Sequence, residues 1–112
     1  NKNYVGVNFI NIKKQVKDIH SHNKKEREVQ SKNIVDSNKI LLKKYKPSIE
    51  TTLHCLTKKY TVHIHPIQFN AISALSTCND ILNDLFKDLK QEYCLVDYVT
   101  PGIDVTIELL KK

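Results

Sequence analysis

Several residue types are scarce in this sequence, and each scarcity excludes a class of protein. The chain has no methionine, no tryptophan, two glycines and three cysteines. The cysteines are an odd number and have no C-x-x-C spacing, since they lie at Cys55, Cys78 and Cys94. This argues against a disulfide framework and against a thiolate metal site. We therefore expect them to be buried small hydrophobic residues. No apolar run approaches the roughly 18 residues that span a bilayer, so we expect no membrane span.

The remaining composition is that of a globular protein. The chain has 112 residues, of which 40% are hydrophobic and 27% are charged. We expect one domain over residues 1–112, and no secretion leader is recognisable, which predicts a cytoplasmic protein. The missing methionine and the few glycines suggest that the domain is incomplete. The net charge of +6 is compatible with an anionic partner. The basic residues between Lys13 and Lys46 have a single interleaved aromatic, Tyr45, which favours a solvated surface over nucleic-acid binding.

The hydrophobic pattern predicts alternating strands and helices. Residues 13–38 are polar and lysine-rich and are expected to form a long surface excursion, partly helical at best. We expect strands where β-branched and aromatic residues cluster, and helices where apolar residues recur at helical spacing. The predicted strands are 4–9, 60–65 and 94–99, and the predicted helices are 47–56, a segment starting at Pro66, 79–89 and 103–110. This alternation favours an α/β or α+β fold with a covered sheet.

One stretch concentrates histidines. Glu50 and His54 are four residues apart and share one face of the predicted helix, beside a stripe of Ile49, Leu53 and Leu56. His63 and His65 would point to the same side of the predicted strand, where both could bind one divalent ion. Two ligands do not complete a catalytic zinc site, which normally has three. The pattern alone is compatible with a metal site and with an incidental pair.

A second H-x-H motif lies in the polar stretch. His20-Ser21-His22 has no apolar neighbours to fix its geometry, and we interpret it as a solvated loop. Cys55, next to His54, does not form a nucleophile and base with it, because adjacent helical residues point about 100° apart.

The ordered motifs P-S-I-E-T-T-L-H (47–54), H-I-H-P (63–66) and D-Y-V-T-P-G (97–102) resemble the class II aldolase/adducin family. The resemblance covers residues 47–110 and, more loosely, 4–9. It implies a three-layer α/β/α fold with a central, mainly antiparallel sheet covered by helices. It also implies a homotetramer whose zinc site lies near subunit boundaries.

The same resemblance implies a reaction. His63 and His65 would be two zinc histidines, with a third outside this chain, and Glu50 would be both a ligand and the proton-transferring group. The implied enzyme is a zinc-dependent lyase of carbohydrate metabolism that cleaves a C–C bond of a phosphorylated ketose, like fuculose- or rhamnulose-phosphate aldolases. A glutamate at position 50 favours an aldolase, since the related pentulose-phosphate 4-epimerases carry Asp there.

Three alternatives stay open at this point. The first is a non-catalytic, adducin-like interaction domain, and the second is a 4-epimerase-type relative. The third is a basic nucleic-acid-binding module, which would bind with steep salt dependence. Tyr98 either lines a site or is a buried structural tyrosine. His54 either orients a ligand or packs under the strand.

Overall fold

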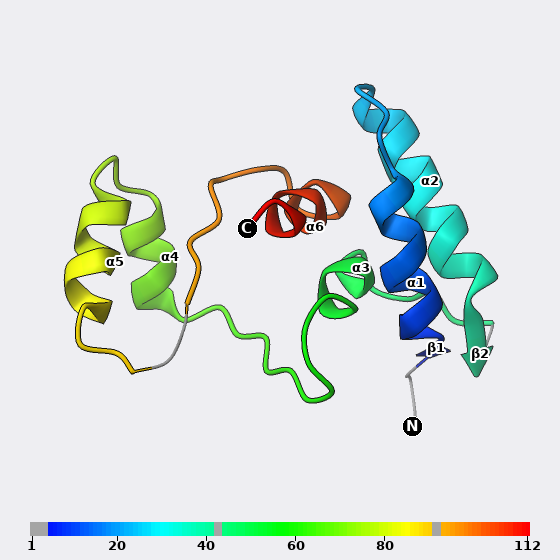
Figure 1. The fold of residues 1–112 in the computed structure, drawn as a ribbon, viewed down its shortest axis with the longest axis horizontal. Coiled ribbons are helices and arrows are strands. Elements are labelled where there is room, and N and C mark those ends of the chain that lie inside the picture. Colours follow the sequence, from blue (N-terminus) through cyan, green and yellow to red (C-terminus); the bar gives the residue numbers. More distant parts are fainter. Residues whose placement is uncertain (1–4, 42–43, 91–92) are drawn as a thin grey trace. The chain divides into compact units, whose positions relative to one another are not determined.

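The computed structural model describes residues 5–41, 44–90 and 93–112. Their elements follow one another along the chain (Figure 1) as β1 (Gly6–Val7), α1 (Phe9–Gln15), the 3-10 helix η1 (Val16–Asp18), α2 (Lys24–Ser37), β2 (Lys39–Leu41), α3 (Thr51–His54), α4 (Ile67–Ser73), α5 (Cys78–Phe86) and α6 (Ile103–Leu110). The chain divides into two compact units. The first unit comprises Asn1–Thr61 with Val96–Lys112, and the second unit comprises Val62–Leu95.

The predicted three-layer α/β/α fold is wrong, because the described residues form a mostly helical protein. Their strands are β1 and β2, which pair antiparallel in a two-stranded sheet. Residues 60–65 and 94–99, both predicted as strands, have no regular secondary structure. The β-branched and aromatic residues of these segments favour a strand only where a neighbouring strand supplies hydrogen bonds and packing. Tyr98 is 92% exposed, which excludes the buried alternative.

The predicted strand 4–9 is reduced to β1, and its first residue lies outside the described part of the chain. Gly6 pairs with Leu41 of β2, and the register is irregular between Gly6 and Val7. A Cβ at position 6 would lie 2.8 Å from the Cβ of Leu41. Glycine is therefore required for the close approach of the two strands.

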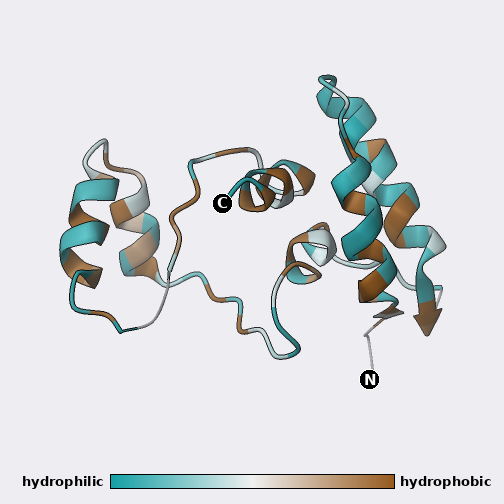
Figure 2. Ribbon diagram, viewed as in Figure 1, coloured by the Kyte–Doolittle hydropathy of each residue, from teal (hydrophilic) through white to brown (hydrophobic). Residues whose placement is uncertain are grey.

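The stretch predicted as a surface excursion contains much of the first unit's core. Ile12, Val16 and Ile19 are buried at spacings of four and three, and they belong to one cluster with Val35 of α2. Figure 2 shows α2 mostly in hydrophilic colours, which is why its sequence resembles an exposed segment. One apolar stripe on each helix is enough to form this cluster, because α1 and α2 pack side by side (Figure 1).

Asparagine side chains fix where both of these helices begin. The Asn8 side chain accepts a hydrogen bond from the Asn11 backbone N–H at 3.2 Å, and Asn23 accepts one from Lys25 N–H at 2.9 Å. Each side chain satisfies a backbone donor that has no partner inside its own helix.

The helix predicted over 47–56 is shorter, and its buried face differs from the prediction. α3 begins after a turn in which the Thr51 hydroxyl donates to the Ser48 carbonyl at 2.7 Å. Ile49 is 71% exposed, whereas Thr52 and Cys55 are buried. The Thr52 hydroxyl lies 2.8 Å from the hydroxyl of Thr106, so a polar pair joins α3 to α6.

α6 confirms the helix predicted over 103–110. Its first turn is tied to α2, because Arg27 Nε donates to Asp104 Oδ1 at 2.8 Å. The same guanidinium donates through Nη1 to the carbonyls of Ser21 and His22 at 3.1 and 2.9 Å. The hydrogen bond to Asp104 raises the pKa of Arg27. Arg27 thus joins α2, the turn before it and α6.

The second unit contains α4 and α5, which confirms the helices predicted from Pro66 and around 79–89. Pro66 is the N-cap of α4. Phe69 of α4 stacks on Phe86 of α5 with centroids 5.8 Å apart, and Tyr93 meets Phe86 edge-on at 5.3 Å. Leu82 is buried in α5. Aromatic packing therefore holds this helical pair together.

The three thiols differ in burial. Cys55 is buried as predicted, Cys78 is half-buried, and Cys94 is exposed, so the prediction is wrong for Cys94. None of the helices in the described ranges is both long and apolar enough to cross a membrane.

Candidate functional site

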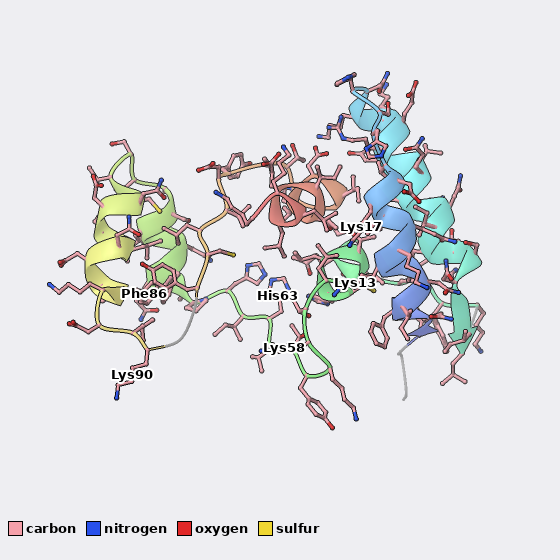
Figure 3. The ribbon with its side chains drawn as sticks, in the orientation of Figure 1. Lys13, Lys17, Lys58, His63, Phe86 and Lys90 are labelled. Atoms are coloured by element: carbon pink, nitrogen blue, oxygen red, sulfur yellow. The ribbon has the colours of Figure 1, made fainter. Side chains whose placement is uncertain are left out.

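His63 and His65 lie side by side although their segment is not a strand. Both are exposed, and they precede α4 in the second unit (Figure 3). Their imidazole rings are stacked, with centroids 4.7 Å apart and planes inclined by 25°. The predicted proximity of the two histidines is observed, but the strand from which it was predicted is not. Two residues separated by one position stay close in an irregular backbone as well as in a strand.

Glu50 and His54 form a second pair, at the two ends of α3 in the first unit. Glu50 is the N-cap, and its backbone carbonyl accepts a hydrogen bond from His54 N–H at 3.0 Å. The Glu50 backbone N–H in turn donates to the Ser48 hydroxyl at 3.2 Å. A carboxylate oxygen of Glu50 and an imidazole nitrogen of His54 lie within 4.8 Å of each other, as predicted from their spacing. This pair offers one oxygen and one nitrogen ligand.

The other H-x-H motif lines a cleft of about 660 Å³ in the first unit. His20 is exposed and Ser21 is half-buried, and His22 is exposed as well, in agreement with the predicted solvated loop. Charged groups that share the lining are paired, because Asp104 binds Arg27 and Glu108 binds Lys111 Nζ. Opposite charges thus cancel within this cleft.

A second cleft in the first unit, of about 410 Å³, was not predicted from the sequence. We call it the lysine cleft. It is lined by Val7, Phe9, Thr51, His54, Cys55, Thr57, Lys58, Lys59 and Thr61. The sequence gives only a partial signal for it, T-K-K (57–59) shortly after α3, which does not identify Val7 and Phe9 as lining residues.

Comparison with known proteins adds no assignment: no family model, curated protein or solved structure matches this chain. The class II aldolase/adducin resemblance therefore stays a prediction from the motifs. The homotetramer and the phosphorylated-sugar substrate stay predictions with it.

Proposed function

We propose that this protein binds a divalent transition-metal ion, with zinc as the expected metal, through His63 and His65. The observation that carries the proposal is the 4.7 Å separation of the two imidazole centroids. Imidazoles that bind one tetrahedral zinc at about 2.0 to 2.1 Å have centroids roughly 5 Å apart. The centroid separation thus suits one shared ion, but the rings are stacked, so both side chains must rotate to turn a nitrogen of each ring toward it.

The exposure of both histidines has two consequences for such a site. Because both rings are exposed, an ion can reach them directly from solvent. The remaining coordination positions are open to water or to another ligand. A site with two protein ligands is expected to bind zinc more weakly than a closed structural site with four.

The role of Glu50 as a further ligand and as the proton-transferring group stays a prediction, because Glu50 belongs to the first unit whereas His63 and His65 belong to the second. The lyase reaction also stays a prediction, since the fold implied by the resemblance is not the fold observed. Metal binding by His63 and His65 is the part of the predicted chemistry that does not depend on that fold.

Zinc titration of the metal-free protein tests the proposal, with affinity measured by competition against a chromogenic chelator. We expect His63→Ala/His65→Ala to weaken zinc binding at least tenfold, because both proposed ligands are removed. The chain supplies a matched control in His20→Ala/His22→Ala, which removes the same chemistry from the other H-x-H motif.

Equal loss of zinc in the two double variants would overturn the assignment to His63 and His65. So would a parent protein that binds no zinc. Glu50→Gln in the same titration tests the predicted third ligand. If zinc binds, the zinc-loaded parent and the His63→Ala/His65→Ala variant can be compared for cleavage of ketose phosphates, which tests the lyase prediction separately.

A further inference from the structure

The lysine cleft is a second candidate site, independent of the proposed metal ligands. It lies in the first unit, between the β1–α1 segment and the turn that follows α3. Its volume of about 410 Å³ is sufficient for a small organic molecule. Neither His63 nor His65 is among its lining residues.

Charge of one sign distinguishes this cleft. Lys58, Lys59 and His54 are among its lining residues, together with the hydroxyl residues Thr51, Thr57 and Thr61. The Nζ of Lys59 also lies 5.4 Å from the ring centroid of Tyr60. None of the described residues that line it is acidic, although the chain has 12 aspartates and glutamates. Lysines and hydroxyls are donors suited to phosphate oxygens.

A further cation lies next to the cleft. Lys13 of α1 places its Nζ 3.4 Å from the carbonyl of Leu56, which lies between two lining residues in sequence. Figure 3 labels Lys13 and Lys58, which come from segments far apart in the chain. Cations from two elements therefore gather around one part of the first unit.

The turn that carries the lysines is held by its own hydroxyls. The Thr57 hydroxyl donates to the His54 carbonyl at 2.8 Å, and the Thr61 hydroxyl donates to the Lys58 carbonyl at 3.2 Å. These bonds close the backbone around Lys58 and Lys59, so a ligand does not have to order a long loop first.

The rest of the lining is apolar and uncharged. Phe9 is 51% exposed, and Cys55 is buried with only 4% of its surface exposed. Burial raises the pKa of the Cys55 thiol, so it stays neutral and adds no negative charge. A ligand in this cleft can thus contact lysines with an anionic group and Phe9 with an apolar body.

We propose that the lysine cleft binds a small organic phosphate that carries an aromatic or apolar body. The phosphate is recognised by Lys58 and Lys59, and the body packs against Phe9. Of the two clefts described in the first unit, this one has no acidic residue among its described lining residues, although the Glu50 carboxylate lies within 4.8 Å of the imidazole of His54.

Titration of the full chain with phenyl phosphate, followed by ¹H–¹⁵N NMR, tests the proposal. EDTA in the buffer keeps metal ions from bridging to the ligand. We expect the shifted amides to lie in residues 7–9 and 51–61. Lys58→Ala/Lys59→Ala is expected to weaken binding about tenfold, because charge-assisted hydrogen bonds are lost.

Matched variants and probes separate this site from general attraction to a basic protein. Lys24→Ala/Lys25→Ala, on α2, removes the same charge outside the cleft lining and should leave the affinity within about twofold. Phe9→Ala should weaken phenyl phosphate but not inorganic phosphate. The proposal is overturned by equal weakening in both lysine variants, by shifts elsewhere in the first unit, or by benzoate binding as tightly as phenyl phosphate.

Discussion

Thr52 and Thr106 are the clearest case of a single contact on which the first unit depends. Their side chains are 1% and 0% exposed, and their hydroxyls lie 2.8 Å apart. A buried hydroxyl that loses its partner cannot form a hydrogen bond with water instead. Removing one partner therefore costs more free energy of unfolding than the hydrogen bond contributes as a net gain on folding. This hydrogen bond therefore helps to hold α3 against α6.

We expect Thr106→Val to lower the free energy of unfolding by about 1 to 3 kcal/mol, because the Thr52 hydroxyl loses its partner while the shape is kept. Thr52→Val/Thr106→Val should cost less than the sum of the two single changes, since both polar groups are removed together. Urea denaturation of the parent, the two single variants and the double variant measures this cycle. Strict additivity would show that the two hydroxyls do not stabilise each other.

At the same scale, the sequence predicted part of the candidate site. The H-x-H spacing and the four-residue spacing of Glu50 and His54 both predict local proximity, and both pairs are observed. The lysine cleft could not be predicted this way, because Phe9 and Lys58 line it together only through the tertiary fold of the first unit. Residues close in sequence are predictable neighbours, whereas residues brought together by tertiary packing are not.

At the scale of elements, helices were predicted better than strands. α4, α5 and α6 each carry a recurring apolar face and a recognisable start, such as Pro66, and these signals are local. The predicted strands 60–65 and 94–99 depended on partner strands that the sequence does not identify. The apolar stripe of α1 and η1 was missed because its residues Ile12, Val16 and Ile19 are separated by lysines and other polar residues.

The entry to α6 leads to a prediction at this scale. Gly102 precedes the helix with φ 114° and ψ −138°, a conformation almost restricted to glycine. A Cβ at this position would have nothing within 4 Å, so strain in the backbone is the expected effect of a substitution. We expect Gly102→Ala to destabilise the protein by about 1 to 3 kcal/mol.

Urea denaturation, with far-UV circular dichroism of the native state, measures this loss. The matched control is Thr100→Ala, which alters the segment just before the same turn without changing a glycine, and it should have little effect. Unchanged stability of Gly102→Ala would mean that the turn relaxes to a different backbone conformation without cost.

For the whole molecule, the two units differ in how much core they have. The first unit buries apolar residues from α1, η1, α2, α6 and the end of α3 in one cluster. In the described part of the second unit, Leu82 is the buried hydrophobic residue, and Ile67, Leu75 and Leu85 are exposed. Stability is therefore expected to come mainly from the first unit, which is completed by residues far apart in the chain.

We expect the isolated segment 62–95 not to fold, because chains below about 40 residues usually need a disulfide, a metal or a partner to be stable. Circular dichroism of this peptide should show little helix and no cooperative thermal transition. The corresponding chain in which a Gly/Ser linker replaces residues 62–95 should still unfold cooperatively, since the core cluster of the first unit is intact. A cooperative transition in the peptide, or its loss in the linked first unit, would show that the core is distributed differently from this interpretation.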